Sequence, residues 1–369
     1  MRENIQLTRE QTFFLLIIGT IGNMVYSHTW IDNDTDRAAW LAAFAGILLL
    51  IPFAAWILYL GKHQPGGTVF DILEAGLGKI SCVLVGVPYI LINIAVAVAM
   101  LNMFTELIKA FFLIFTPHWI VMLVLLLLPV ILLSNGFQAL ARTVELLSVL
   151  GLLNYFFSFA FAFPKYIHME YVIPVFDTSL LGFVKGALFM TGTASECLLL
   201  LMIIVGYIPT PGKRYLWIVT GLAACAVIFS SAILAIMAIM SPELAKRIAF
   251  GGLNAAKLIQ VGEFIRGLEV FIFGTYQFIA IGKTTLCLYC AWTLAKKMFN
   301  NWKPKFLLAV TALMIFAPAV WLNSYNKGYE LAVILGYVVL PFSIFVLLLA
   351  SVSVLLKKKS AKRTGCTAK

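Results

Sequence analysis

Residues 183–209 read FVKGALFMTGTASECLLLLMIIVGYIP and decide the fold of this chain. The stretch is apolar and long enough to cross a bilayer, which takes about 20 helical residues. Its middle is unusual, because Gly192 and Thr193 are followed by Ser195 and the acid Glu196. An acid at bilayer depth is costly and normally faces a cavity or a partner. Glycine and hydroxyl residues beside it predict a broken helix whose free backbone groups meet a ligand.

The same residues have a purely structural interpretation. Gly192 would let two helices pack closely, and Glu196 would pair with a neighbouring cation. We favour the broken helix, because a charge inside a membrane is by default functional.

The composition identifies the class of protein. Of the 369 residues, 62% are hydrophobic and 12% are charged, and the mean hydropathy is +0.99. Soluble domains carry about a quarter of charged residues. We therefore predict an all-α polytopic membrane protein that forms a single transmembrane domain over residues 1–369. The first apolar run has no small-residue cleavage site, so we interpret it as a span and not as a signal peptide.

The apolar runs predict ten transmembrane helices, with a first repeat over about 10–163 and a second over about 182–356. The ten spans cover approximately residues 12–30, 38–60, 80–104, 119–134, 143–163, 182–206, 215–240, 267–295, 305–323 and 329–356.

The charge distribution predicts the orientation of the chain. The net charge is +11, and six basic residues lie in a basic tail, residues 357–369. Such a juxtamembrane cluster suits anionic lipid and not nucleic acid. Placing both termini in the cytoplasm puts most Lys and Arg inside, as the positive-inside rule requires.

The sequence offers no chemistry for an enzyme. The six cysteines are scattered, the four histidines lie far apart, and no nucleophile–base pair stands out. We expect no cofactor, no metal site and no catalytic residue.

Two spans are interrupted at matching places. The first span contains Gly19, Gly22 and Asn23, and the sixth contains Gly192. Interrupted spans in corresponding positions of two halves are typical of transporter binding sites. Five spans followed by five of opposite topology would form an inverted repeat in which helices 1 and 6 are broken.

The eighth span carries the second informative charge. Lys283 lies near its middle, followed by Thr285 and, one turn later, Tyr289. A lysine at this depth needs an acid, backbone carbonyls or a water-filled cavity. We predict that a ligand binds among spans one, three, six and eight, at Gly22, Asn23, Asn93, Ala97, Gly192, Thr193, Glu196, Thr285 and Tyr289.

Two further charge pairs at helical spacing are predicted to be structural. They are Arg142 with Glu145 and Arg266 with Glu269. The external segment 241–266 is predicted to form two short helices, either as a lid or as an ordinary interfacial loop.

Several motifs in order make the chain similar to the B subunits of spore germinant receptors. These spore permeases belong to the amino acid–polyamine–organocation transporter superfamily. The motifs are Pro65–Thr68 with Leu77–Lys79, Phe112–Pro117 with Trp119, Arg142 with Glu145, Gly192 with Glu196, and Arg266–Glu269 with Lys283–Tyr289. The first span departs from the family pattern IG-x-GI, because Ile21-Gly22-Asn23-Met24-Val25 lacks the second glycine and Asn23 brings a side chain into the segment.

The resemblance implies a LeuT-like 5+5 inverted repeat with a midplane site for a germinant, an amino acid above all. It also implies a receptor A subunit and a lipoprotein C subunit as partners, in the inner membrane of a bacterial endospore. In sodium-coupled members of this fold an ion lies between the first break and span eight. We expect Lys283 to supply that charge by bonding backbone carbonyls of the first break. The alternative is that Lys283 only pairs statically with an acid such as Glu196.

Three functions remain open. The first is a germinant-binding sensor, and the second is a proton-coupled amino-acid permease. The third is a channel-forming partner that passes ions after a nutrient binds.

Overall fold

The computed structural model describes residues 6–25, 35–162, 166–175, 177–208, 214–259 and 269–363. Every regular element in these ranges is a helix. The main helices of the first half are α1 (Arg9–Ile21), α3 (Ala39–Leu48), α4 (Ile51–Gly61), α5 (Val69–Phe111), α6 (His118–Ser134) and α7 (Phe137–Ala162). Those of the second half are α8 (Leu180–Ala194), α9 (Glu196–Ile204), α10 (Arg214–Met240), α11 (Pro242–Ala245), α12 (Gly251–Leu258), α13 (Glu269–Met298), α14 (Pro304–Leu322) and α15 (Tyr325–Arg363). Short 3₁₀ turns are η1 (Gly22–Val25), η2 (Asp36–Ala38), η3 (Met169–Tyr171) and η4 (Val205–Tyr207).

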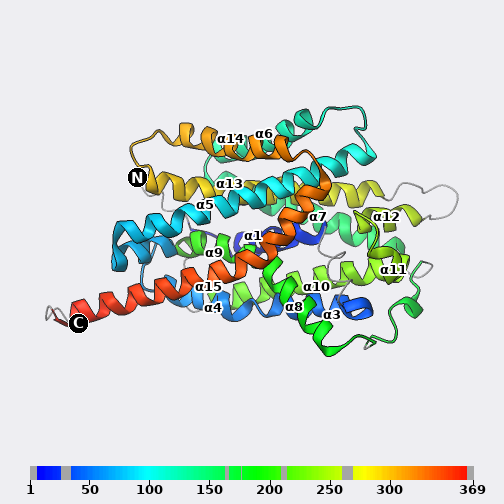
Figure 1. Ribbon diagram of the computed structural model, residues 1–369, viewed down its shortest axis with the longest axis horizontal. Helices are drawn as coiled ribbons and strands as arrows, with labels where there is room; N and C mark the ends of the chain where they lie inside the picture. Colours follow the sequence, from blue (N-terminus) through cyan, green and yellow to red (C-terminus); the bar gives the residue numbers. More distant parts are fainter. Residues whose placement is uncertain are drawn as a thin grey trace.

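The long helices lie side by side along the longest axis of the molecule, with α6 and α14 on one outer face (Figure 1). The short helices α1 and α9 lie in the middle of the bundle. Helix α9 is buried along its whole length. The centre of the molecule is therefore built from α1 and α9.

The membrane prediction is confirmed in its coarse form. Among the described residues, eight helices are long and apolar enough to cross a membrane. They coincide with eight of the ten predicted spans. The other two predicted spans coincide with the shorter apolar helix α6 and with α1 followed by η1.

Local sequence explains where α5 begins and bends. Its N-terminus carries a capping box, in which the Thr68 hydroxyl accepts from the Asp71 N–H and the Asp71 carboxylate accepts from the Thr68 N–H at 2.6 Å. This reciprocal pair satisfies two donors that a helix start leaves free. Gly78 then has φ +86° and ψ 174°, which L side chains rarely adopt. It separates a short helix over 69–77 from the long span that follows.

The packing of the bundle follows a regular pattern. Helix α1 packs against α10, and α8 packs against α3. Helix α5 packs against α15, and α13 packs against α7. Two further pairs, α5 with α13 and α3 with α10, also join the two halves. The bundle is therefore held together by contacts between helices of the first half and helices of the second half.

Both predicted interruptions are close to helix ends. Helix α1 ends at Ile21, and Gly22 starts the 3₁₀ turn η1. In the sixth span the boundary lies at Ser195, not at Gly192–Thr193 as predicted. The helix continues through Gly192, since the Ser195 N–H still bonds to the Thr191 carbonyl oxygen at 2.9 Å, and the Ser195 hydroxyl donates to the Gly192 carbonyl oxygen at 2.5 Å.

Gly192 instead marks a close crossing of α8 and α15. A Cβ at Gly192 would collide with the carbonyl oxygen of Gly336, and a Cβ at Gly336 would lie 2.8 Å from Thr193 Cγ2. The absence of a side chain at Gly192 therefore serves helix packing, the alternative that the sequence left open.

Candidate functional site

A hydrogen bond joins the two interrupted spans directly. Asn23 is fully buried, and its Nδ2 donates to the Thr193 carbonyl oxygen at 2.5 Å. The Asn23 side chain therefore occupies the gap between η1 and the end of α8.

A buried ammonium links the middle of α13 to the end of α1 and the start of α9. Lys283 Nζ in α13 lies 2.6 Å from Glu196 Oε2 at the start of α9. It also donates to the carbonyl oxygen of Gly19 in α1. The side chains of Lys283 and Glu196 are only 2% and 4% exposed. Both predicted partners of Lys283, an acid and a carbonyl beside the first break, are therefore present at once.

The Lys283–Glu196 contact acts through charge. Glu196 Oε2 lies within ion-pair distance of the ammonium, but the contact does not have the geometry of an aligned hydrogen bond. Moving two such charges out of water is expensive, and their attraction repays the cost only when the partners stay together. Separating α13 from α9 therefore requires a replacement for each charge.

A small cavity lies beside this pair. Its volume is about 10 Å³, and its lining includes Gly19, Asn93, Glu196 and Lys283. A cavity of this size is just large enough for one water molecule. Asn93 is held in place because its Nδ2 donates to the Tyr89 carbonyl oxygen at 2.9 Å. The arrangement is a closed site with both signs of charge.

Seven of the nine predicted ligand residues do not line this cavity. They are Gly22, Asn23, Ala97, Gly192, Thr193, Thr285 and Tyr289. Ala97 is buried in the hydrophobic core. The Thr193 hydroxyl bonds to Met190 O at 3.1 Å, and the Thr285 hydroxyl bonds to Ile281 O at 2.5 Å. Both hydroxyls are thus used within their own helices.

Tyr289 belongs to an aromatic cluster farther along α13. Its ring stacks on Phe137, with centroids 4.6 Å apart, and Phe137 also contacts Tyr207 at 5.3 Å. These three rings connect the ends of α13, α7 and η4. Such stacked pairs stabilise by roughly 0.5–1.5 kcal/mol beyond their buried area. In this closed arrangement Tyr289 is a packing residue.

Neither of the two predicted structural charge pairs is found among the salt bridges of the described residues. Arg142 is exposed and Glu145 is partly buried, and the salt bridges of the described residues do not include this pair. Arg266 lies outside the described residues, so its pairing with Glu269 stays a prediction.

Two features of the site were missed by sequence reasoning. Tyr89 OH donates to the Leu199 carbonyl oxygen at 2.7 Å and so fixes α9 against α5. Gly19 was noted as an interruption but not as the acceptor for Lys283. A tyrosine in an apolar span carries no signal of its partner, because any helix can offer a carbonyl.

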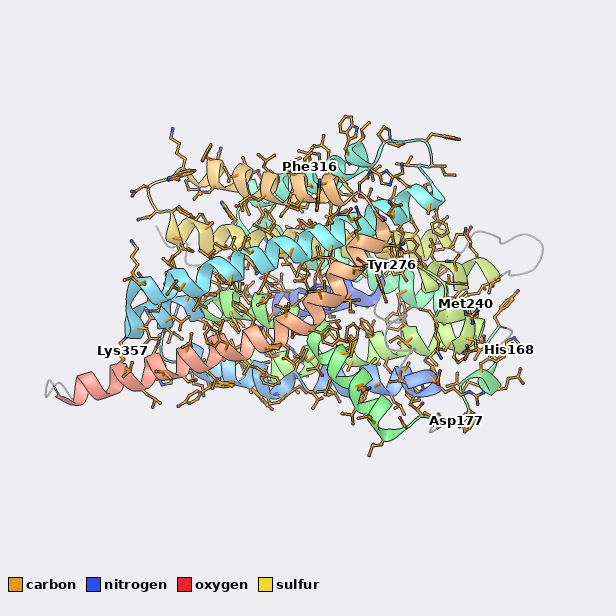
Figure 2. All side chains as sticks on the ribbon, viewed as in Figure 1. His168, Asp177, Met240, Tyr276, Phe316 and Lys357 are labelled. Atoms are coloured by element: carbon orange, nitrogen blue, oxygen red, sulfur yellow. The ribbon has the colours of Figure 1, made fainter. Side chains whose placement is uncertain are left out.

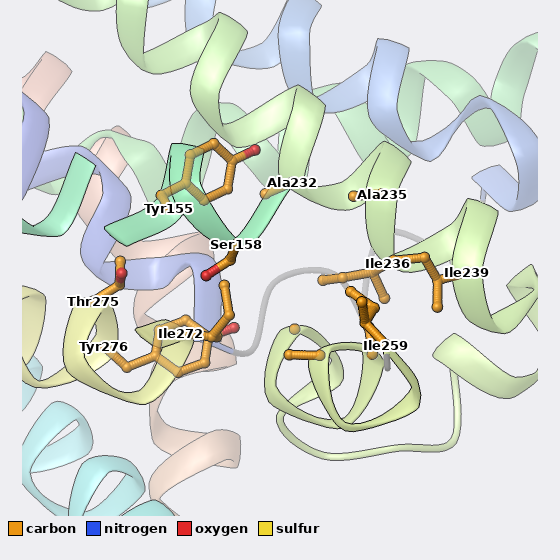
Figure 3. A pocket seen from close by; sticks show the side chains of 13 residues that line it. Tyr155, Ser158, Ala232, Ala235, Ile236, Ile239, Ile259, Ile272, Thr275 and Tyr276 are labelled. Atoms are coloured by element: carbon orange, nitrogen blue, oxygen red, sulfur yellow. The ribbon is translucent and has the colours of Figure 1, made fainter. Parts of the chain in front are cut away.

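A second, apolar cavity of about 50 Å³ lies between α7, α10, α12 and α13 (Figure 3). Helix α12 covers it, in the segment predicted to form two short helices. The hydroxyls at its edge are already engaged, since Tyr155 bonds to Ser231 at 2.8 Å and Thr275 donates to Gly151 O at 3.2 Å. Apolar lining of this kind is hard to read from sequence, because every span is apolar.

Comparison with known proteins identifies the family. A family model described as spore germination protein, the spore permeases, matches residues 6–327. No curated protein matches the chain. The matched range covers the described helices from α1 to α14, with Lys283 and Glu196 among their residues. The chain therefore belongs to the spore germination protein family.

Proposed function

We propose that this chain is the nutrient-binding subunit of a spore germinant receptor, and that its ligand binds where α1, α5, α9 and α13 meet. The observation that carries the proposal is the buried Lys283 ammonium between Glu196 and the Gly19 carbonyl. A buried pair of charges inside a membrane-spanning bundle is by default a functional site.

The charges favour an amino acid as the ligand. A zwitterion can replace both partners of the pair, with its carboxylate on Lys283 and its ammonium on Glu196. The exchange leaves neither buried charge alone, so α9 and α13 can move apart without an uncompensated charge. Asn93 would then face the body of the ligand. The remaining predicted residues would meet the ligand only after this opening.

A LeuT-like inverted repeat of ten spans accommodates this site. Counting α1 with η1 and the shorter helix α6 as spans gives the predicted ten. The matching neighbours support the repeat, since α1 with α10 corresponds to α8 with α3, and α5 with α15 corresponds to α13 with α7. The two broken spans then lie at equivalent places of the two halves.

We expect that ligand binding does not require sodium, because Lys283 supplies the positive charge. Its ammonium bridges the first break and span eight, the position of an ion in sodium-coupled members of this fold. Ligand response should therefore persist when sodium is replaced by choline. A strict sodium requirement would contradict this role.

Receptor A and lipoprotein C subunits in the inner membrane of the endospore complete the proposal. Both termini would face the cytoplasm, as the Lys and Arg bias predicts. The sensor interpretation requires binding without uptake. The second candidate, a proton-coupled permease, uses the same pocket, in which the buried Lys283–Glu196 pair takes the place of a metal ion.

One experiment tests the ligand and separates the two functions. The chain is purified with its receptor partners and exposed to a panel of amino acids, sugars and nucleosides. We expect saturable binding of an amino acid, lost in Lys283→Met and largely lost in Lys283→Arg. Binding of a sugar or nucleoside alone would overturn the amino-acid assignment. Uptake of the bound ligand into reconstituted vesicles would favour the permease.

A further inference from the structure

A separate cavity lies at one end of the bundle, far from the site described above. It is formed where α4 ends, where the helix over 69–77 begins, and where α15 leaves the bundle. Its volume is about 200 Å³, and its lining includes His63, Gln64, Ala75, Ser353 and Lys357. Lys357 lies at one end of the molecule, opposite His168 and Asp177 (Figure 2).

The wall of this cavity is firmly built. A Cβ at Gly76 would lie 2.5 Å from the Ser353 carbonyl oxygen, so the helix over 69–77 rests directly on the backbone of α15. His63 is held by α4, since its Nδ1 lies 3.3 Å from the Tyr59 carbonyl oxygen and its ring meets the Tyr59 ring edge-on.

The charge of the cavity is positive. Among its lining residues Lys357 carries a positive charge, and none is an acid. The acids of the adjoining helix, Asp71 and Glu74, are each 2.9 Å from Lys297. Lys297 offsets one of these two charges, and neither acid lines the cavity, so Lys357 is the charged group that an occupant would meet.

The cavity also offers hydrogen-bond donors. Ser353 is 1% exposed, and among the described residues its Oγ has no hydrogen-bond partner. A buried hydroxyl without a partner is costly and is normally matched by a ligand or a water. With Gln64 and the Lys357 ammonium, it forms a set of donors suited to phosphate oxygens.

The position of the cavity at the ends of two apolar spans indicates which ligand it binds. The apolar spans Asp36–Gly61 and Tyr325–Lys357 both end at its rim. Lipid phosphates lie just outside the hydrocarbon core, where such spans end. Beside the cavity α15 presents the exposed apolar residues Val352, Leu355 and Leu356 to the surroundings. We propose that this cavity binds the phosphate headgroup of an anionic phospholipid, whose acyl chains lie along α15.

Native mass spectrometry of the protein in detergent tests this site with short-chain phosphatidylglycerol and phosphatidylcholine. Lys357→Gln removes the charge, and Ala75→Phe fills the cavity while leaving every charge in place. Lys305→Gln is the matched control, because Lys305 is exposed at the start of α14 and does not line the cavity.

We expect wild type and Lys305→Gln to retain phosphatidylglycerol over phosphatidylcholine, and Lys357→Gln and Ala75→Phe each to weaken that preference about tenfold. Loss in Lys357→Gln with full retention in Ala75→Phe would show diffuse attraction to the basic tail and overturn the site. Inorganic phosphate that binds as tightly as the lipid would overturn the lipid assignment. None of these readouts depends on a germinant.

Discussion

Gly22 lies directly beneath the side chain of Lys283. A Cβ at Gly22 would be 2.8 Å from Lys283 Cδ, 2.9 Å from Cγ and 3.2 Å from Cβ. These atoms belong to the stem of a side chain whose tip is fixed by Glu196 and by the Gly19 carbonyl. Gly22 therefore leaves the space that the stem of Lys283 needs when its ammonium links α13 to α1.

Gly22→Ala should displace Lys283 and reduce the nutrient response strongly. The stem must shift as a unit, at a cost of about 1–3 kcal/mol for an overpacked core. The measurement is germination of spores that carry the variant, together with its abundance in the membrane. Gly19→Ala is the control on the same helix, because its new Cβ would lie 3.5 Å from the nearest atom, an ordinary contact. A normal response in Gly22→Ala would contradict the proposed role of Lys283.

Gly192→Ala should lower the stability of the protein more than it changes ligand preference. The added Cβ would collide with the backbone of Gly336, which cannot move without shifting α15. Abundance in the membrane and the melting temperature in detergent measure the effect. Gly151→Ala is the matched control, since its nearest neighbours would lie 3.9 and 4.0 Å away. A stable Gly192→Ala protein with an altered ligand preference would restore Gly192 to the binding site.

The helical class and the positions of the spans could be predicted because a bilayer imposes length and apolarity on every span. The end of α1 at Gly22 could also be predicted, because the group Gly19, Gly22 and Asn23 is unusual in an apolar span. The boundary at Ser195 was placed three residues early. A glycine signals either a break or a close crossing, and only the position of Gly336 on α15 distinguishes the two.

The candidate site was predicted in part. Lys283 and Glu196 stand out because charges in spans are rare. Tyr289 has the spacing to share a face with Thr285, but its ring stacks on Phe137, which is far away in sequence. Spacing along one helix predicts which residues share a face and not which neighbour covers that face.

The orientation of the chain can be tested by labelling single cysteines in intact cells. The loop between α13 and α14 should be cytoplasmic and the segment of α11 external, because the Lys and Arg bias requires it. Asn301→Cys should then resist an impermeant maleimide, whereas Glu243→Cys should react. Five native cysteines are buried, and Cys366 in the tail should be replaced by serine first. Labelling of Asn301→Cys from outside would reverse the orientation.

The last prediction concerns the strength of the Lys283–Glu196 pair. Lys283→Met or Glu196→Gln alone leaves the other charge buried without its partner, which should cost about 3–5 kcal/mol. The double variant removes both charges and should cost less than the sum of the two single changes. Chemical unfolding in detergent measures the four free energies.

The pair of Lys297 and Glu74 is the matched control cycle. It joins the same types of charge at 2.9 Å, but its side chains are 22% and 40% exposed. Its coupling should stay below about 1 kcal/mol, because solvent screens exposed pairs. A coupling between Lys283 and Glu196 no larger than this would mean that the buried pair is loosely held. The ligand would then have no locked pair to exchange, and opening of the site would need a different trigger.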